Sequence, residues 1–214
     1  VTNLYAEYYE NYGATVIYDG GTIDNLYIST TASNGACKNV TPVAGMTYKG
    51  GQTDEAALTP VAEIDAKKFT SLADAIATAD NKTVILLKDV TEDVVIPSDK
   101  TVTLNLNGKK LTNASSDTIT VASGANLTIT GEGTVDNVTH GKADIYNNGT
   151  VILNGGNYTR SQEAENTTET SGGNSYYNIL NHGDMTIDGA VKVLSTGHFS
   201  SLVANGYYSY SSTN

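Results

Sequence analysis

Apolar and polar residues alternate along this chain in a short phrase that recurs several times. The phrase is a small or variable residue, then two apolar residues at every second position, then glycine. Copies begin at residues 102, 125, 149 and 183, and a degenerate copy that ends in Lys88 instead of glycine begins at residue 82. Alternation with period two predicts a short β-strand with one buried face, and glycine suits the sharp bend after it.

The spacing of the copies indicates a repeat protein. Successive copies start 20, 23, 24 and 34 residues apart, and the first three steps match one repeat of a solenoid. The long step contains SQEAENTTETSGG, residues 161 to 173. This stretch is too polar for a buried strand, so we expect it to be a loop that projects from one repeat and can be deleted without loss of the fold.

Further short strands are expected on both sides of each copy, which gives three strands per repeat. In such a solenoid, alternate side chains point inward and stack on their equivalents in the repeats above and below. A β-sandwich fits less well, because strands three apart resemble each other more than neighbouring strands do. One interior column is predicted to contain Leu104, Leu127, Leu153 and Ile187.

One segment before the first copy has helical periodicity. In FTSLADAIATADNKT, the residues Phe69, Leu72, Ile76 and Ala79 lie on one helical face. Ser71, followed three residues later by an acidic residue, makes a capping box. We expect a short helix here that covers the exposed edge of the first repeat.

The region that contains these features resembles a known family. FTSLADAIATA, VILLKDVTEDVVIP and KTVTLNLNGKKLT are similar to segments of pectin-lyase-like right-handed parallel β-helices, found as repeated modules in surface proteins of Gram-positive bacteria and in phage structural proteins. The resemblance covers about residues 61 to 193 and implies an all-β, right-handed parallel β-helix with a short N-terminal capping helix. It specifies the fold better than the activity.

The first 60 residues need a separate interpretation. ATVIYDGGTIDNLYIST, from residue 14, matches the phrase, but it lies far from the next copy, and GGQTDEAALTP reads as a linker. Residues 1–60 are either the last coils of a preceding module or a small β-rich anchor domain, which we slightly favour. The β-helix is assigned to residues 61–214. The start at Val1 and the end at GYYSYSSTN suggest a piece of a larger parent protein.

Composition and charge narrow the functional classes. The net charge is −11, only 16% of residues are charged, and Arg160 is the sole arginine. Nucleic-acid binding needs clustered basic residues, and anionic membranes repel an acidic protein, so neither partner is expected. With one cysteine, Cys37, the chain has no internal disulfide and no Cys-based zinc site.

Catalysis is the main alternative, since β-helices host polysaccharide lyases and glycoside hydrolases. Arg160 would be the natural base of a lyase, but its place beside the polar insertion suggests a solvated turn residue. Asp184 and Asp188 share one face of a strand, yet they bracket inward positions and should point into water. No paired aspartates accompany either His-Gly element, so we expect no catalytic residues.

Metal and cofactor sites are also not expected. None of the three histidines has a second histidine within ligand spacing, and we expect them at turns or on the surface. Three residues at equivalent positions after the repeated strands suggest a turn ladder rather than a calcium or sugar site. The histidines are His140, His182 and His198, and the ladder residues are Asn107, Asn154 and Asp188.

Tyrosines near the insertion and near the C-terminus are the most suggestive ligand-binding feature. Exposed tyrosines on a rigid frame suit sugar stacking or protein contacts, although they would equally cover the side of the solenoid or contact a further coil. The residues concerned are Tyr176, Tyr177, Tyr207, Tyr208 and Tyr210.

These patterns favour a non-enzymatic structural or adhesive module that presents loops to a glycan, a host surface or a partner protein. It would be extracellular, either on a bacterial cell surface or as a head fibre or decoration protein on a phage virion. In the virion setting we expect self-association as a trimer. The alternative is a carbohydrate-active enzyme on the same fold.

Overall fold

The structure is a computed structural model. It describes residues 60–139, 141–161, 177–194 and 201–206 with their side chains, and within the first 50 residues it describes the backbone of seven strands. The early strands form a parallel three-stranded sheet and two two-stranded sheets, of which the β2–β6 pair is parallel and the β4–β5 pair antiparallel. Their bounds are β1 Asn3–Ala6, β2 Val16–Ile17, β3 Thr22–Ile28, β4 Thr31–Ala32, β5 Gly35–Ala36, β6 Val40–Thr41 and β7 Thr47–Gly50.

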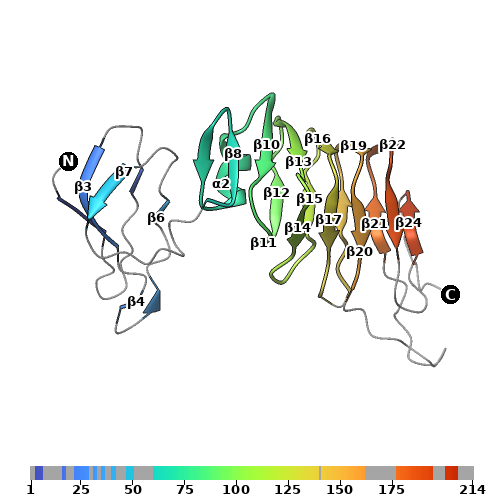
Figure 1. Ribbon diagram of the computed structural model, residues 1–214. Helices are drawn as coiled ribbons and strands as arrows, with labels where there is room; N and C mark the ends of the chain where they lie inside the picture. Colours follow the sequence, from blue (N-terminus) through green and yellow to red (C-terminus); the bar gives the residue numbers. More distant parts are fainter. Residues whose placement is uncertain are drawn as a thin grey trace.

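Beyond residue 60 the strands form three sheets, which we call sheets I, II and III (Figure 1). Sheet I is ordered β22-β19-β16-β13-β10-β8-β9, sheet II β11-β14-β17-β20-β23 and sheet III β12-β15-β18-β21-β24. From β10 onward the chain visits sheets I, II and III in turn, and each strand pairs in parallel with its equivalent in the next repeat. The expected all-β class and the parallel pairing at three strands per repeat are confirmed.

The strand bounds show how short each element is. Sheet I contains β8 Ala62–Ile64, β9 Lys67–Phe69, β10 Lys82–Leu86, β13 Thr101–Asn105, β16 Asn126–Thr130, β19 Thr150–Asn154 and β22 Asp184–Asp188. Sheet II contains β11 Val90–Thr91, β14 Lys109–Thr112, β17 Gly133–Asp136, β20 Asn157–Thr159 and β23 Lys192–Leu194. Sheet III contains β12 Val94–Ile96, β15 Ile119–Val121, β18 Ile145–Asn147, β21 Tyr177–Asn181 and β24 Ser201–Asn205.

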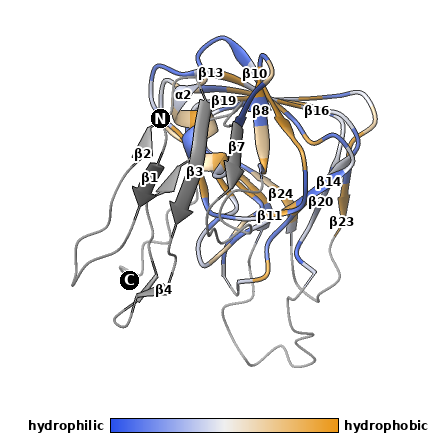
Figure 2. Cartoon of the chain, turned by 60° about the vertical axis from the view of Figure 1, so that its left-hand side comes forward, coloured by the Kyte–Doolittle hydropathy of each residue, from blue (hydrophilic) through white to orange (hydrophobic). Residues whose placement is uncertain are grey.

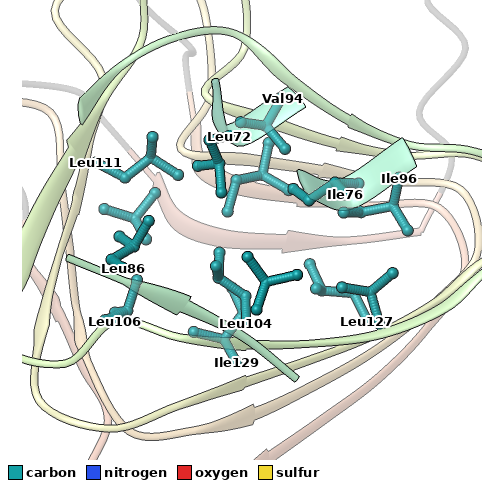
Figure 3. Close-up of a cluster of buried hydrophobic side chains, with 14 of the residues drawn as sticks. Leu72, Ile76, Leu86, Val94, Ile96, Leu104, Leu106, Leu111, Leu127 and Ile129 are labelled. Atoms are coloured by element: carbon teal, nitrogen blue, oxygen red, sulfur yellow. The ribbon is translucent and has the colours of Figure 1, made fainter. Parts of the chain in front are cut away.

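The core lies between the three sheets and is filled by alternate residues of the strands from β10 to β21 (Figure 3). Leu104 and Ile129 of sheet I and Ile96 of sheet III are completely buried. Apolar and polar residues alternate along the strands of the stack (Figure 2), as expected when only one face of each strand is buried. The interior is therefore packed rather than hollow.

The register corrects one column of the predicted interior. Leu104 pairs with Ile129, which pairs with Leu153 and then Ile187, whereas Leu127 pairs with Val102 and belongs to the neighbouring column. The predicted placement of Leu127 is wrong for two reasons. The copy expected to begin at residue 102 begins at Lys100, so Leu104 aligns with Ile129, and in the next repeat Leu127 aligns with Val151 rather than with Leu153. The Lys100 carbonyl accepts a hydrogen bond from Asn126, as the corresponding carbonyl does in later repeats.

The same register corrects the predicted turn ladder. Asn154 and Asp188 are partners across β19 and β22, but the equivalent residue in β13 is Asn105 rather than Asn107. Asn107 instead donates a side-chain hydrogen bond to the Leu86 carbonyl at 2.9 Å.

The expected helix is confirmed as α2, Leu72–Thr78. The Ser71 side chain accepts a hydrogen bond from the backbone N–H of Asp74, as predicted for its cap. All four residues of the predicted apolar face are buried, but Phe69 lies in the strand β9 rather than on the helix, and Ala79 is the C-cap. The helix thus closes the interior at the first repeat, where Leu72 and Ile76 lie against Val94 and Ile96 (Figure 3).

The other end of the stack is different. The last described strands of the three sheets are β22, β23 and β24. Ile187 was expected in the interior and is aligned with the core residue Leu153, but its side chain is 50% exposed. No described element covers it, so this end of the core is open within the described residues. No helix in the described part of the chain is long and apolar enough to cross a bilayer.

Candidate binding surface at the long-loop edge

Differences in loop length are concentrated at one edge of the stack. The connections from sheet II to sheet III are residues 92–93, 113–118, 137–144, 160–176 and 195–200. All but the first are longer than the segments of two to four residues that turn the other two corners. We call this side the long-loop edge. Length variation confined to one side of a repeat protein is typical of its binding face.

Asp93 joins the first two connections of this edge. Its carboxylate accepts backbone hydrogen bonds from Ala114 at 2.8 Å and from Ser115 and Ser116 at 3.1 Å each. Partial burial opposes ionisation, but these N–H donors and the Ser115 hydroxyl outweigh it and lower the pKa of Asp93. The carboxylate therefore organises a loop that belongs to the following repeat.

Two buried asparagines extend the contacts to the third connection. Asn113 accepts a hydrogen bond from the backbone of Val138 at 2.7 Å and donates one to the Thr139 hydroxyl at 2.7 Å. Asn137 donates to the Ser116 and Ala143 carbonyls at 2.9 and 2.8 Å. Both side chains are 1% exposed, so the loops rest on satisfied internal polar groups.

Asp136 performs the same role for the longest connection. It is completely buried, and its carboxylate accepts hydrogen bonds from the Ser161 backbone at 2.8 Å and from the Ser161 hydroxyl. Lys110 forms an ion pair with the same carboxylate. The beginning of the 160–176 connection is therefore fixed to the preceding repeat.

Arg160 is not the solvated turn residue that its sequence context predicts. Only 1% of its surface is exposed, and it follows directly after β20 in the interior of the long-loop edge. Burial raises the pKa of Asp144 and the positive charge of Arg160 partly opposes this, so the two side chains are electrostatic neighbours. The prediction is wrong because Arg160 lies in the interior beside Asp144, a buried residue of the preceding repeat.

Asp144 is the most perturbed group of this edge. It is completely buried, and neither carboxylate oxygen accepts a hydrogen bond from a described residue. Burial raises the pKa of Asp144 well above its ordinary value, while the amide of Asn178 and the charge of Arg160 act more weakly in the opposite direction. Nearby, burial and then the charge of Asp144 raise the pKa of Tyr158, whose hydroxyl donates to the Gly155 carbonyl at 3.0 Å.

An open groove lies on sheet II, toward its short corner with sheet I. Its volume is about 420 Å³. Thr134, Asn157 and Lys192 occupy one outward column of successive strands there, and Glu132 lies beside them. The lining is polar and contains both signs of charge, so it suits a polar ligand lying along the stack.

The predicted tyrosine site is only partly within the described structure. Tyr177 is the first residue of β21 and is half-buried, whereas Tyr176, Tyr207, Tyr208 and Tyr210 lie outside the described residues. A tyrosine that the sequence did not single out, Tyr146, contacts His182 edge-on, with ring centroids 5.4 Å apart.

The other residues considered from sequence are dispersed. Asp184 and Asp188 are exposed on β22, as expected, and His182 lies in the turn before that strand. His140 and His198 lie outside the described residues. No group of three or more His, Cys, Asp or Glu side chains in the described structure is arranged to hold a metal ion.

Sequence reasoning missed the interior acidic pair, Asp136 and Asp144, together with Arg160. The only available signal was that each of these residues stands directly before or after a predicted strand, in two successive repeats.

No protein-family model matches this chain, and no curated protein or solved structure matches it either.

Proposed function

We propose that residues 61–214 form a right-handed parallel β-helix that acts as a non-enzymatic structural or adhesive module. The observation behind this proposal is the long-loop edge, where connections of varied length follow successive strands of a filled three-sheet core. A rigid core with variable loops on one side is suited to contact with a surface. The sequence resemblance supports an extracellular setting, on a bacterial cell or a virion.

The anchoring side chains give this edge a defined shape. Asp93, Asn113 and Asp136 each bind the loop of a neighbouring repeat, so the loops share one framework. Preorganised loops lose less conformational entropy on binding than independent ones. The ligand in this proposal is a glycan or a host-surface protein.

The test compares the full chain with a variant in which residues 162–175 are replaced by a short Gly-Ser linker. The probes are an immobilised panel of neutral and acidic oligosaccharides and intact Gram-positive cells. We expect saturable binding by the full chain and its loss in the variant, with an unchanged circular dichroism spectrum. Absence of binding to every probe would contradict the proposal.

A matched control distinguishes the loops from the groove. Lys192→Glu reverses a charge in the groove and leaves the long-loop edge intact, so binding should persist. If this substitution abolishes binding and the linker replacement does not, the groove is the contact site and the long-loop edge is not.

A carbohydrate-active enzyme is the second candidate, and one observation favours it. Asp136, Asp144 and Arg160 lie together, and a strongly perturbed carboxyl group is typical of active sites. Against it, none of the three is more than 1% exposed, so a substrate has no access to them. Incubation with polygalacturonate and neutral glycans, with and without calcium, should release no product; turnover that disappears in Asp144→Asn would establish the enzyme.

A further inference from the structure

The two ends of sheet I are complementary in charge. One edge strand, β22, has Asp184 and Asp188 exposed, and the opposite edge strand, β9, has Lys67 and Lys68 exposed. Neither edge is paired with another described strand. An unpaired sheet edge can accept a strand from another chain.

The open end also leaves core positions uncovered. Ile187 of β22 and Val203 of β24 are 50% and 38% exposed, although their partners in the preceding repeat, Leu153 and Ile179, are completely buried. Two apolar side chains and three strand edges that pair with no further described strand therefore lie at the same end of the stack. Burying such a face is favourable in proportion to the apolar area removed from water.

From these features we propose that the open end binds the β9 end of a second copy of this chain, so that the molecules associate head to tail. The strand directions agree with this arrangement. β9 is antiparallel to β8 and β8 is antiparallel to β10, so β9 runs parallel to β10 and hence to β22. A second copy placed further along the stack extends sheet I by parallel pairing.

Side-chain alternation brings the opposite charges together. Phe69 of β9 faces the core, and alternate residues point to opposite faces. A pairing that keeps Phe69 on the same side as Ile187 puts Lys68 on the outer side, with Asp184 and Asp188. Opposite charges on adjacent strands stabilise the pairing.

The helix of the second copy offers a compatible surface for the open end. α2 lies at the same end of the stack as β9, and its exposed side includes Ala73 and Ala77. These small residues are one helical turn apart and permit close approach of Ile187 and Val203. Head-to-tail contacts use two different surfaces, so they generate open-ended assemblies rather than closed dimers.

A head-to-head pair is less favourable. A two-fold axis through the middle of β22 would pair this strand with itself in antiparallel orientation. Asp184 of one copy would then face Asp188 of the other twice, and like charges directly opposite each other are destabilising. The charge pattern therefore selects β9 as the partner of β22.

The first test measures the mass of the full chain by sedimentation velocity from micromolar to millimolar concentration. We expect the average mass to rise with concentration. Asp184→Lys with Asp188→Lys should weaken association about tenfold, and so should Lys68→Asp. Combining the three substitutions should restore it. Glu132→Lys, an exposed charge reversal away from both ends, should have no effect.

Some results would overturn the proposal. A wild-type chain that stays monomeric throughout would show that Lys68 only protects its edge, and failure of the combined variant to recover would exclude the charge pairing. A chain that associates only after residues 207–214 are removed would show that its own C-terminal segment covers the open end.

A crosslinking test distinguishes the orientation. In a Cys37→Ser background, one chain has Lys68→Cys and another has Asp188→Cys. Adjacent strands bring backbones within the separation that a disulfide spans. A disulfide should form in the mixture and much less in either variant alone. A dominant disulfide between one Asp184→Cys chain and one Asp188→Cys chain, mixed in the same background, would indicate head-to-head association and contradict the inference.

Discussion

Truncation of one interior residue of sheet I tests the packing most directly. Leu153 is completely buried between Ile129 and Ile187 of the neighbouring strands, and Ile152, its neighbour in β19, points to the other face and is 38% exposed. Leu153→Ala removes a buried side chain, whereas Ile152→Ala makes a comparable truncation on the outer face of the same strand. The pair therefore separates loss of core packing from loss of strand propensity.

The expected magnitude follows from the surroundings of Leu153. Buried Leu→Ala substitutions cost about 2.7–5.0 kcal/mol, and less where the site can collapse around the cavity. Because Ile187 is half-exposed and lies at the last described strand of sheet I, partial collapse is favourable. We therefore expect a loss of about 3 kcal/mol for Leu153→Ala, and about 1 kcal/mol or less for Ile152→Ala.

Urea unfolding followed by far-ultraviolet circular dichroism measures both variants, since the chain has no tryptophan. Equal denaturant slopes are required, so that a shift in midpoint reports stability alone. Equal losses for the two variants, or a larger loss for Ile152→Ala, would refute the assignment of Leu153 to the interior and of Ile152 to the outer face.

Three further predictions concern the long-loop edge. The pKa of Asp144 is raised in the folded state. Its contribution to stability is therefore full below its ordinary pKa and is lost as the pH rises through the raised value. At pH 7 the Asp144→Asn variant should unfold at a higher urea concentration than wild type, and in acid this advantage should be smaller. The pKa of Asp93 is lowered, so its contribution to stability is present above its ordinary pKa and is lost as the pH falls through the lowered pKa. Asp93→Ala should therefore be less stable than wild type at pH 7. A difference in stability that does not change with pH would contradict this. Replacement of residues 162–175 by a Gly-Ser linker should leave the thermal midpoint nearly unchanged, and a large drop would show that this segment belongs to the core.

The sequence by itself determined the local structure of this protein. Period-two alternation placed Leu104, Leu127 and Leu153 on inward faces, and all three are buried. The spacing of Leu72, Ile76 and Ala79, with Ser71 before them, predicted the helix and its cap. Strand alternation and helical spacing both involve residues that are close in the sequence. Their periods, two residues for a strand and about 3.6 for a helix, follow from backbone geometry alone.

Only the tertiary structure decided which strands are in register. Sliding a strand by one residue turns its apolar side chains outward, but sliding it by two preserves the alternation. The sequence pattern therefore could not distinguish a start at residue 102 from the observed start at Lys100. Hydrogen bonds between repeats, such as the one from Asn126 to the Lys100 carbonyl, select one register.

The burial of Arg160 was likewise decided by tertiary structure. A lone arginine beside a polar insertion has the local sequence of an exposed turn. Asp144, whose pKa responds to the charge of Arg160, comes from the preceding repeat, and so does Asp136, which holds the adjacent Ser161. Local sequence does not specify which groups from other repeats surround a side chain, so its burial and its electrostatic neighbours emerge only when the repeats stack.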